Sequence, residues 1–213
     1  MVQHFLQQFI IKFLPINDDG DIILEKLKEL ITSRTKIIAI THLSNVTGTI
    51  VPIKEVIEIA KKKNIPVLVD GAQAISHMSV DVQDLDADFY TFSGHKMLGP
   101  TGIGILYGRE EILEVMPPYQ GGGDMILEVK FSGTVFNELP YKFEAGTPNI
   151  SGAAGLGAAI DYLKTLDMQT VEEHESNLLA RMIEKLKMIE GNFTAKGANL
   201  VKDLAQKAYF DVK

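Results

Sequence analysis

The stretch Val67-Leu68-Val69-Asp70-Gly71-Ala72-Gln73 is an apolar run that ends in an acid and a turn. An uninterrupted run of this kind is typical of a strand buried in a parallel sheet. A second β-branched run, Lys36 to Thr41, lies upstream, and an amphipathic helix is predicted between the two, from Pro52 to Lys63. Strand, helix and strand form a β-α-β unit. The sequence therefore predicts an α/β fold, with a mostly parallel sheet and helices on both faces.

Two polar side chains lie at or just after the end of the predicted strand at residues 67–70. Ligands of open α/β sheets gather at the carboxyl ends of the strands, where Asp70 and Gln73 stand. An aspartate at this place can pair with the protonated pyridine nitrogen of a cofactor, and Gln73 can donate to a phenolic ring oxygen. Asp70 can equally be a strand-end cap or turn residue, as in many Asp-Gly pairs. These residues alone leave both interpretations open.

A lysine follows the next apolar run, which covers residues 88–92. Ser93-Gly94-His95-Lys96 precedes a glycine-rich turn, Leu98-Gly99-Pro100-Thr101-Gly102-Ile103-Gly104. Lysine amines form Schiff bases with pyridoxal phosphate, and a partly desolvated amine suits that role. Ser93 and His95 could provide hydrogen bonds to a phosphate. The alternative is a surface loop with a solvated lysine, because short motifs also arise by chance.

Hydrophobic periodicity and turn residues predict the other elements. A short helix is expected to run into a strand at Ile10 to Leu14. The further expected elements are a helix at 22–31, a short connection or helical turn at 80–85, a strand at 103–107 that folds back, and helices at 109–116, 151–166, 170–189 and 199–208.

Composition restricts the classes of function. The 213 residues carry a formal net charge of −7, which argues against a nucleic-acid surface. The chain has no cysteine, which excludes disulfides and thiolate metal sites, and no metal site is expected. The apolar segment at residues 1–14 lacks the pattern of a signal peptide and is too short to span a bilayer. We therefore expect a cytoplasmic protein without a membrane partner.

Five motifs, in this order along the chain, identify a resemblance to a known family. They are Ser44-Asn-Val-Thr-Gly-Thr49, Asp70-Gly-Ala-Gln73, Ser93-Gly-His-Lys96, Gly121-Gly-Gly-Asp-Met-Ile126 and Phe143-Glu-Ala-Gly-Thr-Pro-Asn149. Together they resemble a Suf-type cysteine desulfurase, a fold-type-I, pyridoxal-phosphate-dependent transferase of the class V aminotransferase family. The resemblance extends from the first strand to about Glu190.

The resemblance implies a role for each candidate residue. Lys96 would form the Schiff base with pyridoxal 5'-phosphate and later shuttle protons, which makes it the catalytic residue. Asp70 would face the pyridine nitrogen. The remaining cofactor-binding residues would be Gln73 and Asn45 on the ring-oxygen side, and Ser93, His95 and Thr147 at the phosphate. Thr147 would reach the phosphate of a partner subunit. From composition alone, Asn45 could equally cap the turn around Gly48.

The resemblance also implies a reaction and partners. Such enzymes convert L-cysteine to L-alanine and pass the sulfur, held as a persulfide on a cysteine, to iron-sulfur cluster assembly. The expected partners are a second copy or another desulfurase chain, and a sulfur-acceptor protein. Because this chain has no cysteine and lacks the family's N-terminal part, we expect it to be inactive alone. The alternatives are another class V aminotransferase or lyase, and a non-catalytic cofactor-binding relic or subunit partner.

The resemblance places this chain in the second half of the large cofactor domain. The expected organisation is a partial pyridoxal-phosphate-binding large domain at residues 1–168, a connecting helix toward a small domain at 169–191, and an unassigned tail at 192–213.

Overall fold

The computed structural model of the chain describes residues 10–188. The chain divides into two compact units, Met1–Leu166 and Asp167–Lys213. The helix predicted before residue 10 and the helix predicted at 199–208 lie outside the described residues. The proposed domain boundaries stay a prediction. None of the described helices is both long and apolar enough to cross a membrane.

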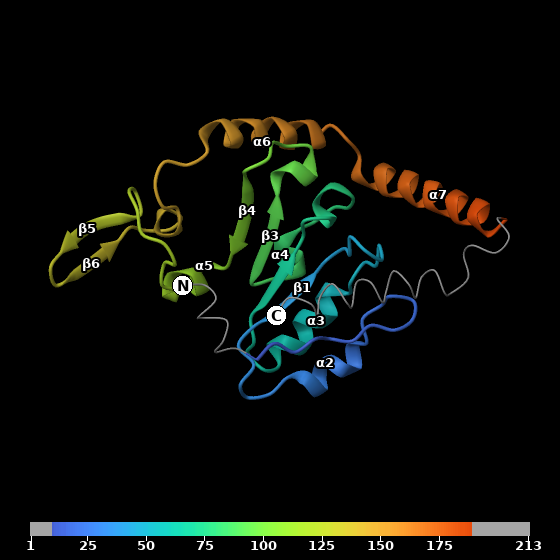
Figure 1. Ribbon diagram of the computed structural model, residues 1–213, viewed down its shortest axis with the longest axis horizontal. Coiled ribbons are helices and arrows are strands. Elements are labelled where there is room, and N and C mark those ends of the chain that lie inside the picture. Colours follow the sequence, from blue (N-terminus) through green and yellow to red (C-terminus); the bar gives the residue numbers. More distant parts are fainter. Residues whose placement is uncertain (1–9, 189–213) are drawn as a thin grey trace, which may run out of the picture. The chain divides into compact units, whose positions relative to one another are not determined.

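A four-stranded sheet forms the centre of the first unit (Figure 1). Its strands are β1 (Ile38–Thr41), β2 (Val67–Asp70), β3 (Phe89–Ser93) and β4 (Gly104–Gly108), in the order β1-β2-β3-β4. The first three strands are parallel, and β4 runs antiparallel to β3. The predicted mostly parallel sheet with helices is therefore confirmed, as is the strand that folds back after the glycine-rich turn.

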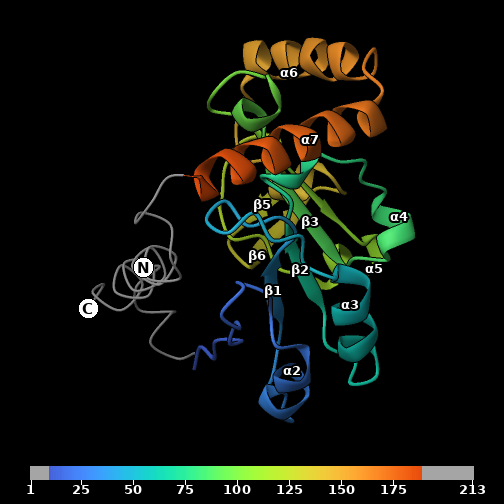
Figure 2. The ribbon, with the colours of Figure 1, turned by 90° about the vertical axis from the view of Figure 1, so that its right-hand side faces the viewer.

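The core lies between this sheet and helix α3 (Ile53–Lys61), which runs alongside it (Figure 2). Val67 and Val69 of β2 are fully buried and share one face of the strand, as a period of two requires. Val56 and Ala60 of α3 are also fully buried in the same cluster. The short helix α2 (Leu24–Leu30) adds Leu27. The predicted β-α-β unit is thus present, with α3 packed against one face of the sheet.

The remaining elements of the described chain include four helices at predicted positions and three short 3-10 helices that were not predicted. They are η1 (Ala74–Ser76), α4 (Val82–Leu85), η2 (Gly94–Met97), α5 (Glu110–Val115), β5 (Ile126–Lys130), β6 (Gly133–Phe136), η3 (Tyr141–Phe143) and α6 (Ile150–Leu163), and α7 (Met168–Lys187) in the second unit. The antiparallel hairpin of β5 and β6 was not predicted. It projects away from the central sheet (Figure 1).

The strand predicted at Ile10 to Leu14 is wrong. These residues have no strand pairing, and the first ladder contact of the described chain is an isolated bridge between Ile16 and Ile22. Ile10 is 76% exposed and Phe13 is 58% exposed. The segment has strand propensity, but a strand forms only where another backbone pairs with it and its side chains are partly buried.

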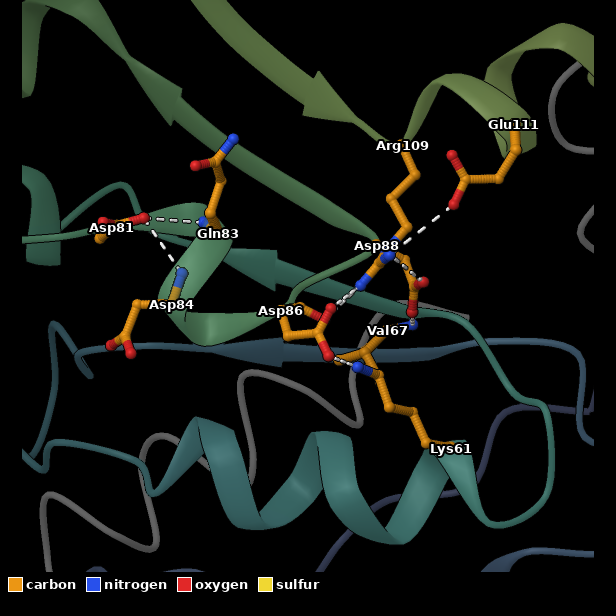
Figure 3. A network of polar contacts seen from close by, with 9 residues as sticks. All are labelled: Lys61, Val67, Asp81, Gln83, Asp84, Asp86, Asp88, Arg109 and Glu111. Atoms are coloured by element: carbon orange, nitrogen blue, oxygen red, sulfur yellow. Dashed lines mark hydrogen bonds and ion pairs between the residues drawn. The ribbon is translucent and has the colours of Figure 1, made fainter.

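A network of charged side chains ties together the amino ends of β2 and β3 (Figure 3). Arg109, directly after β4, pairs with Asp86, and its Nε lies 3.2 Å from Asp88 Oδ1. The other Asp88 oxygen accepts a hydrogen bond of 2.8 Å from the backbone N–H of Val67. Asp86 also pairs with Lys61 at the end of α3. The network therefore stabilises the sheet at the amino ends of its parallel strands, opposite the carboxyl ends.

Replacing Asp88 by alanine should destabilise the fold by about 2 kcal/mol, because the buried N–H of Val67 loses its acceptor and the Arg109 guanidinium loses an ion-pair partner. Asp84→Ala is the matched control. Its carboxylate side chain is 65% exposed and, among the described residues, pairs only with Lys54, so its loss should cost less than about 1 kcal/mol. Urea unfolding of both variants measures the difference, and equal losses would contradict this account of the network.

Candidate functional site

The carboxyl ends of β1, β2 and β3 meet at one edge of the sheet. Thr41, Asp70 and Thr91 are partners in the strand register and therefore lie level with one another. Two backbone bonds of 2.8 Å extend the pairing beyond the strands: His42 N–H donates to Asp70 O, and Gly71 N–H donates to Thr91 O. The edge is thus a regular continuation of the sheet, with the side chains after each strand brought close together.

One oxygen of the Asp70 carboxylate accepts a hydrogen bond within the chain. Oδ1 accepts a hydrogen bond of 2.9 Å from the N–H of Ala72, so Asp70 does cap the turn after β2. Among the described residues, no donor to Oδ2 is found, and the side chain is exposed. Asp70 therefore combines the turn role with a free anionic oxygen at the strand end.

The segment after β3 brings three predicted site residues together. Ser93 Oγ lies 2.8 Å from His95 Nδ1. Lys96 is half-buried on η2, and in the described part of the chain its ammonium has no hydrogen bond or ion pair. Gln73 precedes η1, which contacts η2. The structure therefore places the segments of Asp70 and Gln73 beside those of Ser93, His95 and Lys96.

Asn45 lies in the turn after β1, where its side chain is exposed and forms no hydrogen bond with the described residues. The turn is capped by its neighbour: Ser44 Oγ accepts from Val46 N–H at 3.2 Å and from Thr47 N–H at 3.1 Å. The alternative that Asn45 caps this turn is therefore wrong. The Asn45 amide is available to another partner.

Thr147 lies in an exposed loop whose two ends are fixed. Gly146 N–H donates to Gly123 O at 2.9 Å, and Asn149 Nδ2 donates to Gly102 O at 3.1 Å. Asn149 also caps α6, since its Oδ1 accepts from Gly152 N–H. Within residues 10–188, Thr147 has no hydrogen bond to the other candidate site residues. The structure thus presents Thr147 outward and does not join it to the strand-end cluster of its own chain.

Sequence reasoning missed a buried polar pair behind this edge. His42 Nδ1 lies 3.0 Å from the hydroxyl of Tyr90, and the rings meet edge to face at 86°. Burial lowers the pKa of His42, while burial and the charge of Asp70 raise the pKa of Tyr90. Both rings therefore stay neutral near pH 7. The signal for this pair in the sequence was weak: His42 directly follows one apolar strand, and Tyr90 lies within another.

The stability of the fold should decrease as the pH falls below about 6.5. The unfolded chain takes up a proton on His42 near pH 6.5, whereas the folded chain keeps this buried ring neutral. Protons then favour unfolding, and this residue contributes at most about 1.4 kcal/mol per pH unit. Urea unfolding at pH 7.5 and 5.5 measures the loss.

His42→Asn should show a smaller loss between these two pH values than the wild type. The matched control is His174→Asn, which replaces an exposed histidine on α7. This control should retain the wild-type dependence on pH. If His42→Asn loses as much stability as the control, the buried ring is not the cause.

Comparison with known proteins identifies relatives along most of the chain. The model of the aminotransferase class-V family matches residues 3–202. A cysteine desulfurase of Cronobacter sakazakii is 50% identical over 180 residues, which cover 84% of this chain and 44% of that protein. A probable cysteine desulfurase of Halalkalibacterium halodurans is 50% identical over 179 residues, with the same coverage.

Solved structures agree with these relatives. The crystal structure of the cysteine desulfurase CsdA from Escherichia coli matches with a TM-score of 0.83 and 43% identity, over 89% of this chain and 48% of that one. The apo cysteine desulfurase from Thermococcus onnurineus NA1 matches with a TM-score of 0.82 and 37% identity, over 92% and 50% of the two chains. This chain thus spans about half the length of the proteins that it matches.

Proposed function

This chain belongs to the aminotransferase class-V family, and on that premise we propose that its strand-end site binds pyridoxal 5'-phosphate for the desulfuration of L-cysteine. One observation carries the proposal. Lys96 is half-buried, and its amine has no partner among residues 10–188. It lies on a segment next to the one that bears Asp70, whose Oδ2 also has no partner among these residues. Relatives named cysteine desulfurase favour L-cysteine among the amino acids that this family could use.

The donors at this edge fit the cofactor. The Asp70 carboxylate suits a protonated ring nitrogen, and the amine of Lys96 suits an aldehyde. Ser93 and His95 share a hydrogen bond, and one donor of the pair remains for a phosphate: His95 Nε2–H if the hydroxyl donates to Nδ1, or the Ser93 hydroxyl if Nδ1–H donates to it. Gln73 and Asn45 supply amide groups for the ring oxygen. The geometry therefore supports the roles that the resemblance implies for all these residues.

When bound, pyridoxal phosphate withdraws electrons from the α-carbon of an amino acid. Two residues of the chain would supply the attachment of the cofactor and the control of its protons. Lys96 Nζ would hold the aldehyde carbon at rest and move a proton to and from the substrate. Asp70 would keep the proton on the ring nitrogen. The side chain of Lys96 is half-buried at this edge of the sheet.

The sulfur needs an acceptor that these residues do not contain. L-cysteine and a thiol give L-alanine and a persulfide, as the carbon–sulfur bond breaks and a sulfur–sulfur bond forms. The sequence has no cysteine, so the thiol must come from outside the 213 residues. We infer that a second desulfurase chain or a sulfur-acceptor protein provides it, with iron-sulfur cluster assembly as the destination of the sulfur. A cytoplasmic location stays a prediction.

We also infer that the site is shared between two chains. The support is the outward position of Thr147 on a loop that is fixed at Gly146 and at Asn149. A hydroxyl held in this way is accessible to the phosphate of a second copy.

A second candidate function follows from the missing thiol, namely a non-catalytic, cofactor-binding chain that pairs with another desulfurase chain.

The proposal predicts a visible absorbance band when the chain is mixed with pyridoxal phosphate, and this band should survive dialysis. Lys96→Ala should abolish the band, because the aldehyde loses its amine. Asp70→Asn should weaken retention at least tenfold, because the ring nitrogen loses its anion. Lys62→Ala removes an exposed lysine of α3's end and is the matched control. If Lys96→Ala retains as much cofactor as this control, the proposal fails.

Alanine release separates the two candidate functions. The chain is incubated with pyridoxal phosphate, L-cysteine and dithiothreitol as the sulfur acceptor. If the wild type but not Lys96→Ala releases L-alanine, the site performs the desulfuration chemistry. If the wild type retains the cofactor and releases no alanine, the non-catalytic candidate is favoured.

A further inference from the structure

The Tyr90 side chain connects three strands beneath the candidate site. It begins on β3, where its register partner on β2 is Val69. Its hydroxyl reaches His42, the residue directly after β1, at 3.0 Å. Tyr90 is 1% exposed and His42 is 5% exposed. A buried hydrogen bond of this kind is costly to break, because neither partner can turn to water instead.

Gly71 leaves the space that the Tyr90 ring occupies. A Cβ atom added at Gly71 would overlap with the ring of Tyr90, at Cε1, Cζ and the hydroxyl oxygen. The ring is therefore packed directly against the backbone that follows Asp70. The adjoining peptide groups are held from both sides, by the bond from His42 N–H to Asp70 O and by the bond from Gly71 N–H to Thr91 O.

The pair also leaves the charge of Asp70 uncompensated. Burial keeps the pKa of the His42 ring below its usual value, and the raised pKa of Tyr90 keeps the phenol protonated. Neither ring carries a charge near pH 7, so neither neutralises the carboxylate. Among the described residues, Asp70 also has no ion pair. Its negative charge is thus available to a cation at the edge of the sheet.

We propose that Tyr90 and His42 are positioning residues that fix the Asp70-Gly71 segment and so aim the Asp70 carboxylate at its ligand. The geometry of the segment is a property of the chain itself. That the ligand is the ring nitrogen of pyridoxal phosphate rests on the proposed function above. One experiment without the cofactor and one with it therefore separate the two claims.

The first experiment measures amide hydrogen exchange by NMR in the chain without the cofactor. Tyr90→Phe removes the hydroxyl but keeps the ring against Gly71. The amides of Gly71 and Ala72 should then exchange about tenfold faster relative to those of α3, since a buried bond is lost. Tyr107→Phe is the matched control, because Tyr107 is the register partner of Tyr90 on β4 and also packs against the core. Equal effects of the two variants, or no effect, would overturn the proposal.

Variants of the histidine provide an independent route. His42→Asn keeps a hydrogen-bonding amide near the position of Nδ1, whereas His42→Leu leaves the Tyr90 hydroxyl without a partner. Exchange of the Gly71 amide should stay within threefold of the wild type in the first variant and increase about tenfold in the second. If both variants behave alike, the hydrogen bond does not hold this segment.

The second experiment titrates the chain with pyridoxal phosphate and follows the visible band. Tyr90→Phe should raise the dissociation constant at least fivefold, and Tyr107→Phe should leave it within twofold. The pH midpoint of the band should move upward in Tyr90→Phe. If Asp70 is less well placed, the ring nitrogen of the cofactor keeps its proton, and thus its positive charge, less of the time. That charge disfavours a proton on Lys96 Nζ, so its partial loss raises the pH at which Lys96 Nζ gives up its proton.

The outcomes of the titration are separate from those of the exchange measurement. If the wild type binds and Tyr90→Phe binds as well with the same pH midpoint, the positioning role is overturned. If the wild type does not retain the cofactor, the proposed function fails, and the exchange measurement alone decides the positioning role.

Discussion

The parallel pairing of β1, β2 and β3 depends on the burial of one face of β2. Val67 and Val69 are fully buried, in one cluster with Val56 of α3. A slip of the register by one residue would turn both valines away from the helix, so the packing determines the register. That register places Asp70 level with Thr91 of β3. The arrangement of polar groups at the strand ends is therefore a consequence of apolar packing some residues away.

The two ends of the sheet differ in how their charges are used. At the amino ends, Arg109 joins Asp86 and Asp88, and Lys61 also pairs with Asp86. At the carboxyl ends, the described part of the chain offers Asp70 no ion pair. Paired charges stabilise one end of the strands. At the other end, where α/β folds bind their ligands, the described residues leave the charge of Asp70 unpaired. Chemistry and stability are thus assigned to opposite ends of the same strands.

Local patterns were sufficient to predict the β1-α3-β2 unit and the strand-end position of Asp70, since these need only periodicity and a turn. The segment at Ile10 to Leu14 was not predictable in this way, because strand formation needs a partner backbone that local sequence does not reveal. The pairing of His42 with Tyr90 joins residues 48 positions apart. A contact of this range depends on the tertiary fold, so a single sequence shows the residue types but not their contact.

The central claim is that the amine at the end of β3 is where pyridoxal phosphate attaches. The chain is mixed with the cofactor, reduced with borohydride and digested. Mass spectrometry of the lysine-containing peptides then shows which lysine carries the reduced cofactor. We expect the reduced adduct on Lys96 in preference to the exposed cluster at residues 61–63. An adduct spread over the exposed lysines, with none concentrated on Lys96, would contradict the account.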